Sequence, residues 1–266
     1  MNADELAAAH TVALDLGAWA SAETRAYRVA DVATKAHPAD LVTELDRSIE
    51  RRVRAVIAER FPGHAFVGEE YGGSAVTGRP TWYLDPVDGT TNLANGVPWT
   101  SFSLALAIDD VPLLAVVADP WRHIVFDARA GGGARQNGAQ LVIGETATLR
   151  GGVVSTELAG HEAWQGMQEL SLALTDSFCT LRVMGSGTLT LVGPAAGRGA
   201  GAIVHRFSPI DHLAAVLIAR EAGAQVWDEA GRPSLFPAYG GVMVAAPGVA
   251  DELFGAWHTA LGRDRA

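Results

Sequence analysis

The sequence predicts a mixed α/β architecture, in which layers of helices cover sheets that contain both antiparallel and parallel strands. Three observations support this: helical periodicity in the first sixty residues, hairpin-forming strands in the middle, and alternating strands and helices after about residue 150. The chain has 266 residues, 48% of them hydrophobic and 19% charged, which is a globular composition with enough apolar side chains for a large core. We therefore expect a layered fold with a site between its two parts.

Two helices are expected at the start of the chain. Residues 3–33 are rich in Ala, Leu and Glu, which favours a first helix. Between residues 41 and 57, apolar residues recur at steps of three and four, which indicates a second, amphipathic helix. Phe61, Pro62 and Gly63 then end it.

A run of strands follows, at residues 65–67, 81–84, 101–108, 112–118 and 123–127. Turn-forming pairs, Asp109 with Asp110 and Asn137 with Gly138, indicate antiparallel hairpins.

The second half of the sequence alternates between the two periodicities. Strands are expected at 153–156, 178–184, 202–205, 225–227 and 241–246, and helices at 162–174, 188–196, 211–222 and 249–261. We therefore expect two closely joined halves. Residues 1–145 form an α+β half with most of the acidic site residues, and residues 146–266 form an α/β half that completes the site.

Composition excludes several classes of function. The formal net charge is −10 and no basic patch is visible, so neither nucleic acid nor an anionic membrane is an expected partner. Cys179 is the only cysteine, which excludes an internal disulfide framework and fits a reducing compartment, and we expect it to be buried in an apolar strand. The first residues lack the basic and apolar regions of a signal peptide, so a soluble, cytoplasmic protein is expected.

The most informative stretch runs from Trp82 to Asn92 and reads WYLDPVDGTTN. An apolar strand ends in Asp85 and Asp88, and Pro86 between them makes a rigid turn that lets both carboxylates face one point. Mg²⁺ prefers such oxygen ligands, and the glycine and threonines that follow offer donors to a phosphate. The stretch predicts a metal-dependent phosphoryl-transfer site, although Asp-Pro and Asp-Gly pairs also form ordinary turns.

Further acids could join this site. Glu69 follows the strand at 65–67 and is either a third ligand or solvated charge. Asp211 follows Ser208 and Pro209 at a helix start, so it either caps that helix or projects into the site. Asp46, near the start of the second helix, is favoured there by the helix dipole, or pairs with Thr90 to orient or deprotonate a metal-bound water.

Small residues precede another predicted helix at Gly185, Ser186, Gly187 and Thr188. They leave backbone N–H groups available to an anion or a hydroxylated ligand, or simply allow the helix to begin. His212 is a surface or capping residue, with a specificity contact as the alternative.

Taken together, these segments resemble the inositol monophosphatase family of lithium-sensitive, Mg²⁺-dependent sugar phosphatases. The matching motifs are KxxxxDLVTxxD at 35–46, GEE at 68–70, WYLDPVDGTTN at 82–92, GARQNG at 133–138 and IDHLAAVLIAREAG at 210–223. The resemblance spans roughly residues 35 to 225, and the GEE and DPVDGTTN motifs are its most specific part. It implies a layered α-β-α-β-α sandwich of the sugar-phosphatase type with mixed and antiparallel sheets, a small phosphorylated substrate, and a homodimer.

The resemblance also implies the roles of individual residues. The ligands of two or three Mg²⁺ ions would be Glu69, Asp85, the carbonyl of Val87, Asp88 and Asp211. Thr90 with Asp46 would activate water. Asp88, Gly89 and Thr90 would hold the phosphate, while Gly185, Ser186 and Gly187 would line the alcohol side.

The chain departs from the family's pattern at the alcohol side. The usual Trp-Asp-x-Ala-Ala-Gly motif appears here as Ile210 to Ala215, which keeps Asp211 but lacks the Trp and the Gly. An acid that binds substrate hydroxyls in inositol-specific members is absent, and Val204, His205 and Arg206 occupy its neighbourhood.

Inositol 1-phosphate is the default substrate by resemblance, and His205 makes histidinol phosphate the alternative. A sugar bisphosphate or a 3′-phosphoadenosine nucleotide is less favoured. A catalytically inactive, phosphate-binding relative should have lost one of the acids or Thr90, and none is lost.

Overall fold

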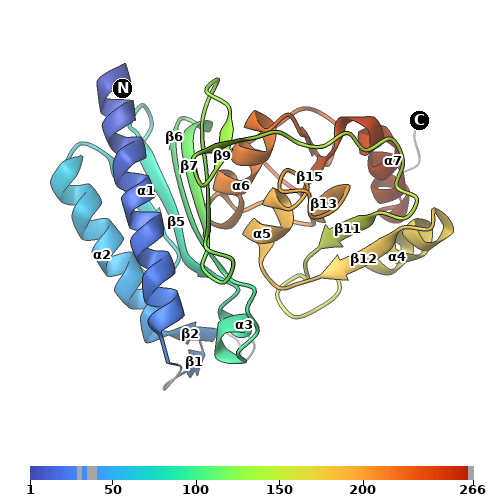
Figure 1. The fold of residues 1–266 in the computed structure, drawn as a ribbon, viewed down its shortest axis with the longest axis horizontal. Coiled ribbons are helices and arrows are strands. Elements are labelled where there is room, and N and C mark those ends of the chain that lie inside the picture. The colour runs from blue at the N-terminus through green and yellow to red at the C-terminus, as the bar shows by residue number, and fades with distance from the viewer. Residues whose placement is uncertain (29–31, 35–40, 263–266) are drawn as a thin grey trace.

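The computed structural model describes residues 1–28, 32–34 and 41–262. Its elements form five layers (Figure 1): α1 and α2, a sheet of eight strands, α5 and α6, a sheet of five strands, and finally α4 and α7. The predicted α-β-α-β-α sandwich is confirmed.

The first layer consists of α1 (Ala3–Ala26) and α2 (Glu44–Arg60), which pack on one face of the large sheet. In α2, Ile49, Val53 and Ile57 recur on one face and are fully buried. In α1, Gly17 admits the sheet closely, because a Cβ there would lie 2.8 Å from a methyl of Val116.

Both helices are shorter than expected. The first was predicted to reach residue 33, but Tyr27 has extended backbone angles and ends α1. The second was predicted from residue 41, but Leu41–Thr43 is the strand β2, which pairs antiparallel with β1 (Val32–Thr34). Residues 29–31 and 35–40, which include the start of the KxxxxDLVTxxD motif, lie outside the described residues.

The large sheet has the strand order β10-β9-β8-β7-β6-β5-β3-β4. All neighbouring strands run antiparallel except β3 and β5, which are parallel. Its strands in chain order are β3 (Ala65–Gly68), β4 (Gly72–Gly73), β5 (Thr81–Asp88), β6 (Ser101–Ile108), β7 (Val111–Asp119), β8 (Ile124–Arg129), β9 (Ala134–Gln136) and β10 (Ala139–Leu141). The predicted turns at Asp109 and Asn137 are both present, with positive φ at these residues.

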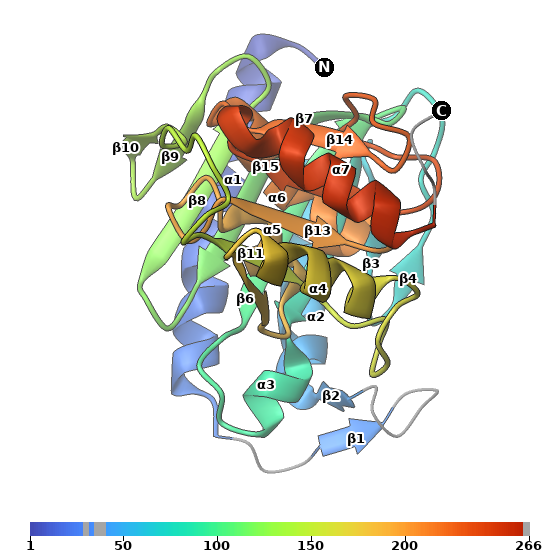
Figure 2. The same ribbon diagram turned by 90° about the vertical axis from the view of Figure 1, so that its right-hand side faces the viewer.

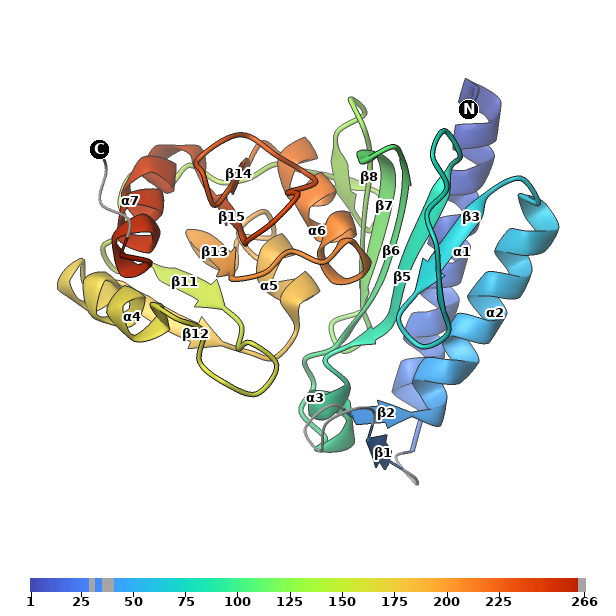
Figure 3. The same ribbon diagram turned by 180° about the vertical axis from the view of Figure 1, so that it is seen from behind.

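The middle helical layer is α5 (Gly187–Val192) and α6 (Pro209–Glu221). Its apolar side chains share one core with residues of both sheets, including Ala105 and Phe126 from the large sheet and Val204 and Val244 from the small one. The views from either side (Figures 1 and 3) show these helices between the two sheets.

The small sheet has the order β12-β11-β13-β15-β14. Its strands are β11 (Val153–Thr156), β12 (Thr180–Val183), β13 (Gly201–Val204), β14 (Gln225–Asp228) and β15 (Val242–Ala245), with β11 parallel to β12 and β13 and the other pairs antiparallel. Figure 2 shows α4 (Met167–Asp176) and α7 (Ala250–Ala260) covering its outer face, and the one-turn helix η1 (Pro247–Val249) precedes α7.

Further local predictions differ from the structure. The helix expected over residues 188–196 ends at Val192. The helix expected from residue 162 begins at Met167, after Gly166 with φ of 96°. The strand expected from residue 178 begins at Thr180, because Phe178 has a positive φ, and Cys179 is buried just before that strand. The short helix α3 (Thr90–Ala94) was not expected. None of the described helices is both long and apolar enough to span a membrane.

Candidate active site

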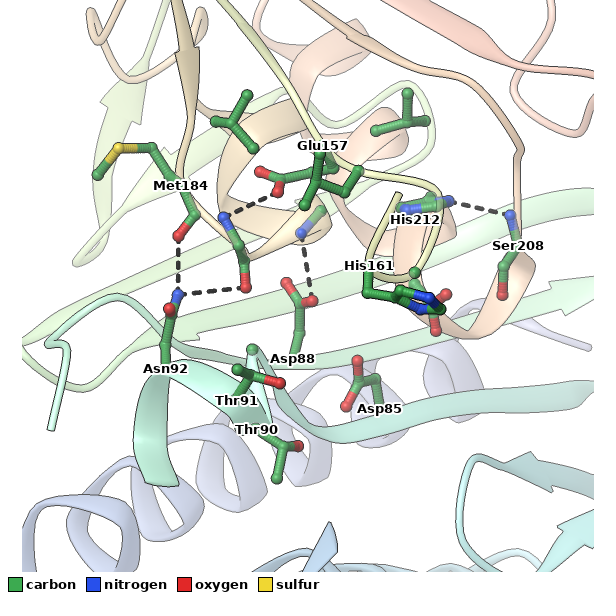
Figure 4. A pocket seen from close by; sticks show the side chains of 18 of the residues that line it. Asp85, Asp88, Thr90, Thr91, Asn92, Glu157, His161, Met184, Ser208 and His212 are labelled. Carbon is green, nitrogen blue, oxygen red and sulfur yellow. Dashed lines mark hydrogen bonds between the residues drawn. The ribbon is translucent and has the colours of Figure 1, made fainter. Parts of the chain in front are cut away.

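A cavity of about 1060 Å³ lies between the end of β5 and the segments that lead into α5 and α6. Its lining includes most of the predicted site residues: Glu69, Asp85, Val87, Asp88, Gly89, Thr90, Gly185, Gly187, His205 and Asp211. Figure 4 shows Asp85 and Asp88 reaching into it from β5, with Glu157 and His212 on the opposite side. The structure thus brings together residues that are up to 142 positions apart in the sequence, from Glu69 to Asp211.

The geometry of β5 places its two acids. The sequence predicted that this strand ends at Leu84, but it continues to Asp88, and its pairing with β6 is irregular between Asp85 and Asp88. Pro86 has no N–H to give to the sheet, so an irregularity is expected here. Asp85 Oδ1 accepts the Val87 N–H at 2.9 Å, which fixes the turn of the backbone.

Asp85 is buried with acids around it. Burial raises its pKa well above the ordinary value of 3.8, and the negative charges of Glu69, Asp88 and Asp211 raise it further. All four of these acidic residues line the same cavity. The acids that the sequence placed on separate elements therefore converge on one pocket.

A cation suits this donor set. In the described part of the chain, no three carboxylates or imidazoles already surround one point closely enough to hold an ion. The four carboxyl groups are nevertheless the hard oxygen donors that Mg²⁺ prefers, and a bound cation would relieve the repulsion that raises the pKa of Asp85.

Thr90 and Asp46 are directly paired. The Thr90 hydroxyl lies 2.8 Å from Asp46 Oδ1 and 2.9 Å from the carbonyl oxygen of Val87. Asp46 is fully buried, and its Oδ2 also accepts the N–H and the hydroxyl of Thr43 at 2.9 and 2.5 Å. Asp46 therefore caps α2 and also pairs with Thr90, while the action of this pair on water stays a prediction.

Gly89 joins β5 to α3 with a φ of 93°. A Cβ at this position would lie 2.8 Å from the Gly185 carbonyl oxygen and 3.0 Å from that of Trp99. Only glycine tolerates both the backbone angle and the close approach. Asn92, on α3, binds the same segment, and its side-chain N–H groups donate to the carbonyls of Trp99 and Met184 at 2.8 and 2.7 Å.

Backbone N–H groups at the start of α5 bind the carboxylate of Asp88. Asp88 accepts the backbone N–H groups of Thr188 at 2.8 Å and Gly187 at 3.2 Å, and the Ser186 hydroxyl donates to it at very short range. Burial raises the pKa of Asp88, and the Ser186 hydrogen bond partly opposes this. Two of the N–H groups that we expected to be available to a ligand, those of Gly187 and Thr188, are thus bound by Asp88.

Sequence reasoning missed Glu157, which follows β11 and lines the cavity. It accepts the Gly185 N–H at 2.8 Å and a short hydrogen bond from the Thr190 hydroxyl. Burial raises its pKa to about 7, and the charge of Asp88 raises it as well. The available signal was the one that identified Glu69, namely an acid directly after an apolar strand.

The imidazoles of His205 and His212 line the cavity. His212 is buried, and burial lowers its pKa to about 4. Its Nδ1 accepts the backbone N–H of Ser208 at 2.9 Å. The expected hydrogen bond from the first turn of α6 to the Ser208 side chain is absent. Burial and the neighbouring Arg206 also lower the pKa of His205.

Comparison with known proteins identifies the family to which the chain is similar. The chain matches the model of the inositol monophosphatase family over residues 2–260. It is 36% identical over 209 residues to the probable inositol 1-monophosphatase ImpA of Mycobacterium tuberculosis, which covers 77% of each chain. Its fold matches the Thermotoga maritima IMPase with a TM-score of 0.84, at 27% identity and over 94% of this chain and 96% of that one. An IMPase/NADP phosphatase complexed with Mg²⁺ and phosphate shares the fold with a TM-score of 0.74, at 23% identity and over 85% of each chain.

Proposed function

Since this chain belongs to the inositol monophosphatase family and is a phosphoric monoester hydrolase, we propose that it hydrolyses a small phosphorylated alcohol with Mg²⁺, and that inositol 1-phosphate is its substrate. The observation that carries the proposal is the convergence of Glu69, Asp85, Asp88 and Asp211 on one cavity beside the Thr90 and Asp46 pair.

In this proposal the ligands of Mg²⁺ are the four acids and the carbonyl of Val87, which all line the cavity. Two or three bound ions would supply positive charge that acidifies water and neutralises the departing alkoxide. The related IMPase/NADP phosphatase, complexed with Mg²⁺ and phosphate, supports this choice of ion.

The residues of the chain position water and substrate around this charge. The Thr90 hydroxyl donates a hydrogen bond to Asp46, so its oxygen is free to accept one from the attacking water. As the water gives its proton to Thr90, the hydroxyl proton of Thr90 passes to the Asp46 carboxylate. The phosphate would lie at the start of α3, where the Gly89 turn leads into the first N–H groups of the helix. Water then attacks phosphorus in line with the leaving oxygen, without a phosphorylated residue.

The alcohol side bears on the choice of substrate. Gly185 and Gly187 line one wall of the cavity, and Ser186 between them is fully buried. His205 and Arg206 lie where inositol-specific relatives have an acid. Because its pKa is lowered, His205 is neutral at pH 7 and can hydrogen bond to a hydroxyl or to another imidazole. Histidinol phosphate is therefore the second candidate, ahead of a sugar bisphosphate or a 3′-phosphoadenosine nucleotide.

The remaining family properties belong to the same proposal. We expect Li⁺ to inhibit by occupying one of the Mg²⁺ positions. We also expect a cytoplasmic homodimer, with neither nucleic acid nor a membrane as a partner.

Phosphate release from a panel of monoesters, with and without Mg²⁺, tests the proposal. The panel holds inositol 1-phosphate, histidinol phosphate, fructose 1,6-bisphosphate and 3′-phosphoadenosine 5′-phosphate. Asp88→Asn serves as the control for a contaminating phosphatase, because it should release no phosphate. Mg²⁺-dependent release with inositol 1-phosphate preferred supports the proposal. If histidinol phosphate is preferred, it replaces inositol 1-phosphate as the proposed substrate. If no member of the panel releases phosphate, a non-catalytic phosphate-binding protein is favoured.

A further inference from the structure

One carboxylate of α2 is fully buried and lies outside the cavity lining. Glu50 has no exposed surface and follows Asp46 by one helical turn. Its Oε2 accepts the Glu70 N–H at 2.7 Å, and its Oε1 accepts the Tyr71 N–H at 3.2 Å. Glu50 therefore holds the backbone of the segment that follows Glu69.

Arg54, one further turn along α2, strengthens this attachment. Its guanidinium lies 2.6 Å from Glu50 Oε1 and donates to the Gly72 carbonyl oxygen at 2.8 Å. It also stacks over the ring of Phe66 in β3, 4.5 Å from the ring centroid. The turn between β3 and β4 is thus bound to α2 at its start, its middle and its end.

The glycine of the GEE motif fits the same arrangement. A Cβ at Gly68 would lie 2.2 Å from Glu50 Oε1 and 2.7 Å from Oε2. No side chain larger than hydrogen can occupy this position unless the Glu50 carboxylate leaves. Gly68 and Glu50 therefore form one unit, in which the glycine admits the acid that holds the next two residues.

The same helix face also reaches the other side of the site. Residues four apart on a helix lie on one face, so Asp46 and Glu50 point in similar directions. Asp46 binds Thr90, and Glu50 binds the backbone next to Glu69. A single rigid helix thus sets the distance between the residue that activates water and one of the acids.

We propose that Glu50 is a positioning residue, which fixes the Glu69 turn against α2 so that the Glu69 carboxylate is in place for the cation. The inference rests on the proposed function for the identity of that cation. Glu50 itself touches neither substrate nor ion. Its effect is therefore on the affinity for Mg²⁺, more than on the chemical step.

Glu50→Gln is the variant of choice. Both carboxylate oxygens accept from N–H donors, so an amide of equal size must point its own N–H₂ group at a donor and release one side of the turn. Partners that orient metal ligands typically change metal affinity or activity 10- to 100-fold when mutated, so we expect the Mg²⁺ concentration for half-maximal hydrolysis to rise at least about 10-fold. Saturating Mg²⁺ should restore most of the turnover.

The chain offers a matched control in Glu221. It ends α6 and accepts two backbone N–H groups, from Gly131 at 2.9 Å and Gly133 at 2.8 Å, in a turn that does not line the cavity. Glu221→Gln should leave the Mg²⁺ requirement unchanged. Arg54→Lys, which keeps a positive charge beside the buried Glu50 carboxylate but not the forked guanidinium that also reaches the Gly72 carbonyl, is the second variant for the case in which Glu50→Gln does not fold, and it should raise the Mg²⁺ requirement in the same direction.

Two readouts separate the inference from the proposed function. The first is the Mg²⁺ dependence of hydrolysis, and the second is the rise in melting temperature that Mg²⁺ causes, which needs no activity. A folded Glu50→Gln protein with both Mg²⁺ midpoints within twofold of wild type would overturn the inference. A wild-type protein that is stabilised by Mg²⁺ but hydrolyses nothing would instead refute the proposed function, and the melting midpoints would still test Glu50.

Discussion

At the scale of the residue, the Thr90 hydroxyl has one proton and two nearby acceptors. Asp46 at 2.8 Å is a carboxylate, and the Val87 carbonyl at 2.9 Å is neutral. Charge-assisted hydrogen bonds are the stronger, so the proton points toward Asp46. A cation on the Val87 carbonyl would reinforce this choice. The hydroxyl oxygen is then left as the acceptor that faces the cavity.

Thr90→Ala should therefore lower kcat far more than it changes KM. A positioned proton acceptor typically contributes about 100- to 10,000-fold in rate. The alanine side chain lacks the hydroxyl and leaves the acids of the site unchanged. Steady-state kinetics on the preferred substrate measure this, with Thr90→Ser as the control that keeps the hydroxyl and most of the rate. A rise in KM at unchanged kcat would show that Thr90 only holds substrate.

At the scale of the element, the end of β14 shows how one acid closes a turn. Asp228 Oδ1 accepts the N–H groups of Ala230 and Arg232, each at 2.9 Å, and Oδ2 accepts Arg232 Nε at 3.0 Å. Although burial alone raises the pKa of Asp228, these hydrogen bonds outweigh it and hold the pKa below 3.8. The ionised form is thus the one that stabilises the fold.

The sign of the pH dependence follows from this lowered pKa. A carboxyl whose pKa is lower in the folded state contributes stability above its unfolded pKa and loses it as the pH falls toward the folded value. Asp228→Asn should be less stable than wild type by roughly 1 to 2 kcal/mol at pH 7, with a smaller difference below about pH 3.8. Urea unfolding at pH 7 and pH 3 measures both differences. An equal difference at the two values would contradict the assignment.

Element boundaries also show which features the sequence predicts and why others escape it. The period of apolar residues predicts α2 because Ile49, Val53 and Ile57 are also its buried face. The same period does not predict where α4 begins. Gly166, just before α4, packs against the Ala260 backbone, and a Cβ at Gly166 would lie 2.4 Å from the Ala260 carbonyl oxygen. That contact is tertiary, so local propensity does not contain it.

The candidate site divides in the same way. Asp85 and Asp88 are apparent from the sequence because one strand end presents both. Other features depend on contacts between segments that are distant in the sequence. Asp88 accepts N–H groups at the start of α5, and Glu50 accepts the backbone N–H of the residue after Glu69. Residue types and spacing therefore predict which groups take part. Which partner each of these groups binds is known only from the fold.

At the scale of the whole molecule, the two sheets divide the chain near the boundary that we predicted between residues 145 and 146. The large sheet ends at Leu141 and the small one begins at Val153. The division into two halves stays a prediction. The core around α5 and α6 contains apolar residues from both sheets, so the two sheets share this core, while separate cores lie beneath α1 and α2 and beneath α4 and α7.

A buried ion pair joins the halves beside this core. Asp119, at the end of β7, has no exposed surface and lies 3.2 Å from Arg198, which follows α5, and 3.1 Å from Arg122. Arg122 and Arg198 also lie over the ring of Trp99, at 4.4 and 5.8 Å from the ring centroid. Asp119 thus compensates two cations, one from each half.

Asp119→Asn should destabilise the whole molecule, because it leaves both arginines without their carboxylate. Removing one partner of a buried ion pair costs about 3 to 5 kcal/mol, and partial exposure of Arg198 places the expected loss near 3 kcal/mol. Urea unfolding followed by tryptophan fluorescence and far-UV circular dichroism measures it. Because the core is shared, both signals should change in one coincident transition, at a lower midpoint than for Asp228→Asn. Separate transitions for the two signals would mean that the halves unfold independently, and the ion pair would then stabilise only their contact.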